Sequence, residues 1–356
     1  MRYFGIDRIR EGMKLGGTLY TATGEILLRY GTELTDEYIK RIQELSFKGI
    51  YVEDSESREI VIPSIITEDL KLETARVLKG IYTLDEKRFK TLEMASYVNK
   101  IKKCVESIVQ QVLFDDRQVI NLLDVKTYDD VIYFHCINVA ILSIAMAETL
   151  KYNMKEIEEI ALAALLHDIG KRFLPKELVF ETEKYTTPEW KEYQSHSKKG
   201  YEFLKDYVNM SSLAYIAVLQ HHEKYDGSGY PDGRKQDDIN KYAKIISIAN
   251  DYDKMLSQKD QHPASQPAKA YQFIIRNTNT FYDPEVVRAF ATNVALYPVG
   301  VTVKLNDGKT AIVAKNYRGN PLRPLVRIVE PKSLKHFLDL KESPDAKNIA
   351  ITGVDL

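Results

Sequence analysis

The sequence is poor in the residues that mark several protein classes. Its 356 residues include only two cysteines, which excludes a disulfide framework and favours a reducing compartment, the cytoplasm. Seventeen glycines and twelve prolines are too few for a collagen-like chain or for long low-complexity linkers. No apolar run reaches the about 20 residues that a membrane-spanning helix needs, and residues 1–12 lack the apolar core of a signal peptide. We therefore expect no membrane span.

The chain also lacks an excess of charge of either sign. Fifty Lys and Arg residues stand against 51 Asp and Glu residues, which gives a net charge of −1. This balance argues against polymeric nucleic acid as a partner, although it leaves room for a local basic pocket. A hydrophobic content of 44% and a charged content of 28% are usual for globular proteins. At about 150 residues per domain, the length suggests two or three domains.

The pattern along the chain predicts three parts. Residues 1–64 are typical of a small α+β module, with strands at 17–30 around a turn at Thr23-Gly24, a helix capped by Thr35 and a strand at 49–52. Residues 65–297 carry apolar residues at three- and four-residue spacing, which predicts an all-helical domain. The nearly apolar stretch 138–150 should be its central buried helix, with His135 just before it.

The last part, residues 298–356, is predicted to be a small β-rich module. Strands at 301–305 and 310–314 flank Asn306-Asp307-Gly308, a strong hairpin signal, and a third strand follows at 325–329. Between Pro298 and Lys335 eight basic residues face only two acidic ones. We favour a solvated module over an anion-binding patch. The predicted fold class is mainly α: an all-helical domain flanked by a small α+β module and a small β module.

Histidines gather in the helical part. Five of the seven, together with one aspartate, end apolar helices or lie beside them: His135, His167, Asp168, His196, His221 and His222. A single such histidine is usually a packed core residue, but a core does not need several imidazoles, since each buried one needs a polar partner. Neutral imidazole and carboxylate are the usual ligands of Zn, Mn and Fe, and a carboxylate can bridge two ions about 3.5–4 Å apart. The set therefore indicates a metal site.

Neighbouring residues are compatible with a phosphate-containing substrate. Lys171 follows Asp168 by three residues and could offer its ammonium to a phosphate oxygen, or it could be an ordinary surface lysine near a helix end. The segment Asp226–Pro231 should form a tight loop in which Tyr230 either contacts a nucleotide or caps the core. The motifs GxSxG, GxxxxGK[ST] and HExxH are absent from the sequence.

The segments LLHDIGK and HHEKYDGSGYP, with His196 between them, resemble the HD-GYP family. Its members are metal-dependent phosphohydrolases that open cyclic dinucleotides, chiefly cyclic di-GMP. The resemblance covers roughly residues 129–295, and the N-terminal module resembles the small domain often found before bacterial HD-GYP domains. It implies attack by a metal-bridging hydroxide on one phosphodiester, which gives the linear dinucleotide and in a further step the mononucleotide.

The resemblance also assigns roles by position. It implies that Asp168 bridges two divalent ions, Fe or Mn, and that Lys171 assists at the scissile phosphate. Tyr230 would contact the nucleotide, and Asp253 matches a second aspartate of the family, assigned here to substrate binding. The implied metal ligands are His135, His167, Asp168, His196, His221, His222 and the residue at position 250.

The sequence departs from the family pattern at three positions. Val131 stands where some members have a glutamate ligand for a third metal, so two metals are expected. Asn250 stands where the family has an aspartate ligand, and its uncharged carbonyl should bind a divalent ion less tightly; Asp251 could replace it only with a shift of helix register. Lys259 replaces a phosphate-binding arginine, which keeps the charge and loses the bidentate fork.

These departures leave three functional hypotheses. The leading one is a cyclic di-GMP phosphodiesterase. The second is a protein that binds the nucleotide without cutting it, because Asn250 and Lys259 weaken the site, and that passes the signal through its flanking modules to a partner protein. The third is a hydrolase of another cyclic dinucleotide. Helices within 66–113 could pair between two chains in a homodimer or pack within one chain.

Overall fold

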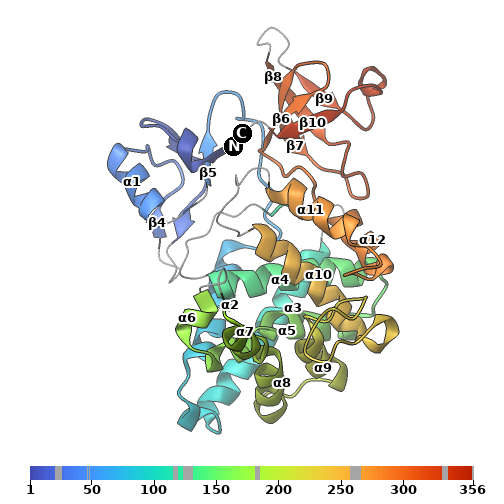
Figure 1. The fold of residues 1–356 in the computed structure, drawn as a ribbon. Helices are drawn as coiled ribbons and strands as arrows, with labels where there is room; N and C mark the ends of the chain where they lie inside the picture. Colours follow the sequence, from blue (N-terminus) through green and yellow to red (C-terminus); the bar gives the residue numbers. More distant parts are fainter. Residues whose placement is uncertain are drawn as a thin grey trace.

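The structure is a computed structural model and describes residues 1–20, 26–45, 47, 49–114, 119–122, 131–180, 185–256, 266–330 and 336–354. Within these residues, helices fill the middle of the chain and strands lie toward both ends (Figure 1). The predicted fold class, a helical domain between two small modules that contain strands, is therefore confirmed.

The N-terminal module contains two small sheets and one helix. The first sheet has the antiparallel order β1 (Arg2–Gly5), β5 (Gly49–Glu53), β2 (Lys14–Leu15), and in the second β3 (Leu19–Tyr20) pairs with β4 (Ile26–Leu28). Helix α1 (Asp36–Glu44) begins after Thr35, whose hydroxyl oxygen accepts from the Tyr38 N–H at 3.3 Å. The predicted cap and strands are confirmed, while the turn at Thr23-Gly24 lies outside the described residues.

The helical domain follows the predicted periodicity. Its α-helices in the described residues are α2 (Glu68–Thr83), α3 (Leu92–Phe114), α4 (Val131–Thr149), α5 (Met154–Leu166), α6 (Lys176–Phe180), α7 (Thr187–Gln194), α8 (His196–Tyr207), α9 (Ser212–Gln220), α10 (Lys241–Leu256), α11 (Gln266–Arg276) and α12 (Pro284–Asn293). A short 3₁₀ turn, η4 (Ile169–Phe173), links α5 to α6.

Helix α4 is the central helix of this domain (Figure 1). It is apolar on every side, and it packs against α2, α3, α5, α10 and α12. Its window Ile132–Thr149 is long and apolar enough to cross a membrane, but 67% of this window is buried inside the protein. This burial is typical of a core helix and agrees with the central helix predicted at 138–150. The expectation that His135 precedes the helix is wrong, because His135 lies on α4 itself.

The C-terminal module is one antiparallel sheet. Its strand order is β10 (Ile351–Val354), β6 (Thr302–Leu305), β7 (Thr310–Lys315), β8 (Leu325–Glu330) and β9 (Phe337–Asp339). The predicted hairpin joins β6 to β7, and Gly308 at its tip has a φ of +83°, a backbone conformation that favours glycine. The three predicted strands are confirmed, whereas β9 and β10 were not expected.

The arginines of this module bind partners inside the protein. Arg318 pairs with Glu148 at the end of α4, and Arg327 pairs with Glu59 at 3.1 Å. Arg323 donates to two backbone carbonyls of the same module at 2.9 and 3.1 Å. The Arg318 and Arg327 pairs tie the module to α4 and to the segment before α2, whereas the Arg323 bonds lie within the module. The preference for a solvated module over an anion-binding patch stays a prediction.

The two small modules also touch each other. The Tyr3 N–H donates to the Gly300 carbonyl at 3.0 Å, and Ile60 joins Val299 and Val329 in a small apolar cluster. The domain boundaries that we predict, 1–64, 65–297 with a core of 129–295, and 298–356, stay a prediction. The contacts show that the first and third parts share an interface.

Candidate metal centre

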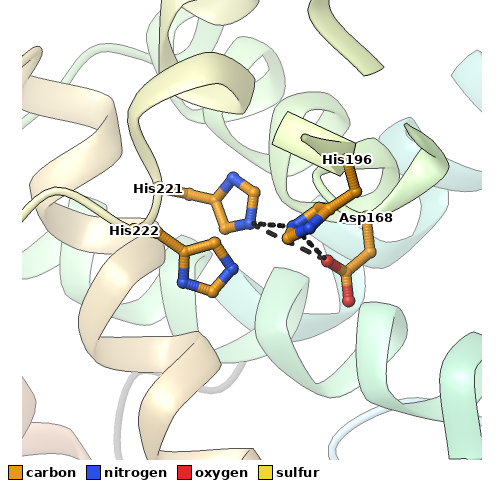
Figure 2. Close-up of side chains that lie close together, drawn as sticks. All are labelled: Asp168, His196, His221 and His222. Carbon is orange, nitrogen blue, oxygen red and sulfur yellow. Dashed lines mark hydrogen bonds and ion pairs between the residues drawn. The ribbon is translucent and has the colours of Figure 1, made fainter. Parts of the chain in front are cut away.

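The candidate site lies where several helices end or begin. His167 and Asp168 directly follow α5, His196 opens α8, and His221 and His222 directly follow α9. Figure 2 shows Asp168 together with His196, His221 and His222. His135 reaches the same place from α4. All six side chains are buried, with exposed fractions of 7% or less. The structure thus brings together the whole histidine–aspartate set that the sequence suggests.

The glycine at position 170 allows this convergence. A Cβ atom on Gly170 would lie 1.8 Å from the His196 carbonyl oxygen and 2.6 Å from the backbone nitrogen of Gly200. Any side chain at position 170 would therefore push η4 away from α8. Because Asp168 precedes η4 and His196 opens α8, this close backbone approach holds the carboxylate next to the imidazole.

Three of the histidine rings are oriented in the same way. In each, Nδ1 donates to the backbone carbonyl three residues earlier, at 2.7 Å for His167, 2.6 Å for His196 and 2.6 Å for His221. In a neutral ring this bond places the proton on Nδ1 and leaves the Nε2 lone pair free to point into the site. Ring orientation of this kind is typical of histidines that bind a metal through Nε2.

Asp168 lies between two pairs of imidazoles. Its Oδ1 is 3.4 Å from Nε2 of His196 and 3.8 Å from Nε2 of His221. Its Oδ2 is 3.4 Å from Nε2 of His167 and 3.8 Å from Nε2 of His135. The donor atoms therefore form two groups that share Asp168, and His222 belongs to the group around His196.

Unpartnered atoms show that these residues fit a metal ion. Among the described residues, Nε2 of His167, Oδ1 of Asp168 and Nε2 of His222 are buried without a hydrogen-bond partner. Leaving a buried polar atom unsatisfied costs about 1–3 kcal/mol, so three in one place need an explanation. Divalent cations that bind nitrogen and oxygen would supply the missing partner to all three.

Burial and the charge of Asp168 govern the protonation of the site. Burial lowers the pKa of His135 and of His221 to about 4, and it lowers the pKa of His196 and His222 well below the usual value. These four imidazoles are neutral at pH 7 and can act as ligands. The site thus meets the requirement that histidine ligands be unprotonated.

His167 and Lys171 respond to the same carboxylate in the opposite direction. Burial opposes their charged forms, but the Asp168 carboxylate outweighs it, raising the pKa of His167 to about 10 and that of Lys171 above its usual value. The pKa of Asp168 is held well below its usual value because Lys171 and His167 outweigh burial. Asp168 therefore remains ionised. A cation beside it would replace the proton on His167, since metal binding releases protons from its ligands.

Helix α10 closes one side of the site. The Asn250 Oδ1 lies 3.1 Å from His135 Nε2, and its Nδ2 donates to Asp251 Oδ1 at 3.3 Å, which fixes the orientation of the amide. Asp251 accepts from Lys224 and, at 2.8 Å, from the Tyr282 hydroxyl, away from the imidazoles. The helix register thus directs Asn250, and not Asp251, at the site.

Asp253 lies behind His135. Its Oδ2 accepts from His135 Nδ1 at 2.8 Å, and its Oδ1 accepts from Asn138 Nδ2 at 2.6 Å. Asp253 is 1% exposed. This placement favours a positioning role through His135 over the substrate contact that the resemblance suggested.

Lys171 and Tyr230 lie beside the donor atoms. The Lys171 ammonium donates to Asp168 Oδ2 at 2.6 Å, with 8% of the residue exposed. The Tyr230 ring stacks on His222 with centroids 4.5 Å apart. Both predicted residues therefore reach the site. Lys259 lies outside the described residues.

The loop that carries Tyr230 is held by residues whose role the sequence did not reveal. Both carboxylate oxygens of Glu223 accept from backbone N–H groups, those of Asp232 at 2.8 Å and Arg234 at 3.0 Å. A Cβ atom on Gly229 would lie 2.4 Å from the His222 carbonyl oxygen, so the loop can approach His222 only with glycine there. Glu223 lies inside the HHEKYDGSGYP segment, and this position in the motif could have identified it from the sequence.

Lys254 was also missed. It lies one turn after Asn250 on α10. Burial raises the pKa of Asp168, and the charges of Lys171, His167 and then Lys254 lower it. The four-residue spacing from Asn250 places both on one face of the helix and could have identified Lys254.

A helical bundle that gathers five histidines around one aspartate has the fold and donor set of a metal-dependent phosphohydrolase. The model of the HD domain family matches residues 99–286. A cyclic di-GMP phosphodiesterase of Pseudomonas aeruginosa is 33% identical over 224 residues, which are 63% of this chain and 54% of that protein. The chain belongs to the HD domain family, and these findings support the resemblance to its HD-GYP members.

Two further relatives are phosphodiesterases of cyclic dinucleotides by name. A cyclic di-GMP phosphodiesterase of Thermotoga maritima is 31% identical over 180 residues, 50% of this chain and 48% of that protein. A 3'3'-cGAMP-specific phosphodiesterase of Vibrio cholerae is 33% identical over 136 residues, 38% of this chain and 29% of that protein. This chain spans about half the length of the Pseudomonas and Thermotoga relatives. A solved structure of an HD-GYP-type protein from Bdellovibrio bacteriovorus aligns at 19% identity with a TM-score of 0.48, covering 81% of this chain and 97% of that one.

Proposed function

We propose that this chain is a metal-dependent phosphodiesterase that hydrolyses cyclic di-GMP to the linear dinucleotide. The observation that carries the proposal is the position of Asp168, whose two oxygens face separate imidazole pairs. One pair comes from the start of α8 and the residue after α9, and the other from α4 and the residue after α5. One carboxylate placed in this way is suited to hold two divalent cations side by side, as two-metal phosphoester chemistry requires.

Two groups of residues would hold the two ions, which we propose to be Fe or Mn. Asp168 belongs to both groups; the first adds His196, His221 and His222, and the second adds His135, His167 and Asn250. Bound there, the ions would make a water molecule nucleophilic and would neutralise charge on the phosphate. Two ions rather than three remain our expectation from Val131, whose side chain lies outside what the structure describes.

Lys171 is suited to act at the scissile phosphate. Its ammonium, 2.6 Å from Asp168 Oδ2, lies where a non-bridging oxygen of a phosphate at the site could accept from it. A fixed cation at that point stabilises the charge that develops as the water oxygen bonds to phosphorus. The bond from phosphorus to the 3′ oxygen breaks, the 3′ oxygen takes up a proton, and the linear product carries a 5′-phosphate.

The three other residues predicted to bind substrate have different proposed roles. Tyr230 lies at the site beside His222 and stays a proposed nucleotide contact. For Asp253 we propose that it positions His135. The predicted role of Lys259 in binding a phosphate of the substrate stays a prediction.

Two further functions are each favoured by one observation. The uncharged Asn250 amide, buried at the second group of donors, favours a protein that binds the nucleotide and cuts it slowly or not at all. The relative that is named specific for 3'3'-cGAMP favours a mixed cyclic dinucleotide as substrate. A cytoplasmic location, the absence of polymeric nucleic acid as a ligand, and a homodimer or a partner protein stay predictions.

The proposal is tested with the full chain purified under reducing, anaerobic conditions and supplied with Mn²⁺ or Fe²⁺. We expect cyclic di-GMP to give the linear dinucleotide by chromatography, and His167→Ala to abolish it. His336→Ala is the matched control, because His336 is exposed in the β module and should leave the rate unchanged. Tight binding without product would favour the binding protein, and product that survives His167→Ala would contradict the proposed metal site.

A further inference from the structure

A layer of aromatic side chains extends from the metal centre to the surface through α7. The rings of Tyr185, Trp190 and Tyr193 lie nearly parallel, with interplanar angles of 13–28° and centroids 5.3–6.0 Å apart. Trp190 also meets Tyr230 edge to face at 6.0 Å, and Tyr230 stacks on His222 at 4.5 Å. Trp190 is therefore only one ring away from a candidate metal ligand.

Trp190 is the exposed member of this layer. It is 42% exposed, whereas Tyr193 is 6% exposed and lies over the Lys171 ammonium at 5.5 Å. Tryptophan is highly buried on average, so an indole left open beside a site needs a reason. Tyr193, which stacks on the indole with centroids 5.6 Å apart, is the ring over the Lys171 ammonium, so the exposed indole lies one ring away from the position that we assign to the scissile phosphate.

We propose that Trp190 is a substrate-binding residue that stacks on one purine base of the cyclic dinucleotide. The inference rests on the proposed function, because it takes the phosphate to lie at Asp168 and Lys171. A cyclic dinucleotide held there by one phosphate carries its bases beside that phosphate, and an aromatic ring binds any base through its π-face. Trp190 is suited to this contact because it is exposed and because both of its neighbours in the layer, Tyr193 and Tyr230, contact residues of the site.

Two substrates separate base binding from chemistry. Bis(2,2,2-trifluoroethyl) phosphate is a diester without a purine or any other aromatic ring, so it needs the metal centre but not the base contact. We expect Trp190→Ala to lower the ratio of kcat/KM for cyclic di-GMP to kcat/KM for this diester by about five- to a hundredfold, the range that stacking of one base gives. Trp190→Phe, which keeps an aromatic face, should restore most of the ratio. Tyr38→Ala, an exposed aromatic on α1, is the control and should leave the ratio unchanged.

Fluorescence gives a second test that does not depend on turnover. Trp190 is the only tryptophan of the chain, so its emission reports on this position alone. Cyclic di-GMP should quench it in a saturable way, and dimethyl phosphate, which has no base, should not. Hydrolysis of cyclic di-GMP with no quenching, or an equal loss on both substrates in Trp190→Ala, would overturn the base contact and leave the hydrolase proposal standing. Saturable quenching without product from either substrate would support the contact and contradict the hydrolase proposal.

Discussion

Asp253 provides the sharpest test of how the second group of metal ligands is held. Its carboxylate accepts from His135 Nδ1 at 2.8 Å and from Asn138 at 2.6 Å. Asp253→Asn keeps the shape of the side chain but removes the charge that orients and polarises His135. Loss of one hydrogen bond to a charged group costs about 1.5–3 kcal/mol. That cost corresponds to an about 10- to 100-fold loss of metal affinity. A loss of this size is typical when a residue that hydrogen-bonds to a metal ligand is replaced.

The assay is a titration of the metal-depleted full chain with Mn²⁺ by calorimetry. We expect two binding events in the wild type, and in Asp253→Asn we expect the one that depends on His135 to weaken about 10- to 100-fold. The matched control is Tyr252→Phe, a neighbouring change on α10 that removes a buried hydroxyl without a hydrogen-bond partner among the described residues.

Two results would refute this reasoning. Equal affinities in Asp253→Asn and the wild type would show that His135 does not depend on Asp253. Equal weakening in Tyr252→Phe and Asp253→Asn would show that the effect comes from disturbance of α10 and not from the bond to His135. Thermal melting of both variants would check that the fold is kept.

Three other predictions follow from the site. Asn250→Asp should raise Mn²⁺ affinity, because it adds a charge 3.1 Å from His135 Nε2, and an unchanged affinity by calorimetry would contradict our placement of Asn250 at the ion. Lys171→Ala should lower kcat by about 100-fold or more, measured by chromatography of product, while the metal content stays at the wild-type value. Glu223→Ala should lower the melting temperature, since it removes two charge-assisted bonds from the loop, each worth about 1.5–3 kcal/mol, and a wild-type melting curve would show that the loop does not need them.

Local signals were sufficient for much of the fold and for the donor set. Thr35 caps a helix and Asn306-Asp307-Gly308 turns a hairpin because both effects act within a few residues. The histidines and Asp168 could be selected from the sequence because polar residues at the ends of apolar helices are costly without a function.

Contacts between distant segments could not be predicted in the same way. The pairing of β1 with β5 and the bond from Asp253 to His135 join residues far apart in the chain, and spacing carries no information about them. The place of Trp190 beside Tyr230 depends on how α7 packs against the loop after α9. Asp253 was therefore assigned by resemblance to the substrate, whereas the structure places it behind a histidine.

The central claim, that Asp168 is shared by two metal ions, is tested most directly by the metal content of anaerobically purified full chain. Elemental analysis should give two equivalents of metal per chain in the wild type. Asp168→Ala should lose both ions, because both groups of donors contain this carboxylate, whereas His222→Ala should affect only the group around His196. Retention of two equivalents in Asp168→Ala would contradict the account.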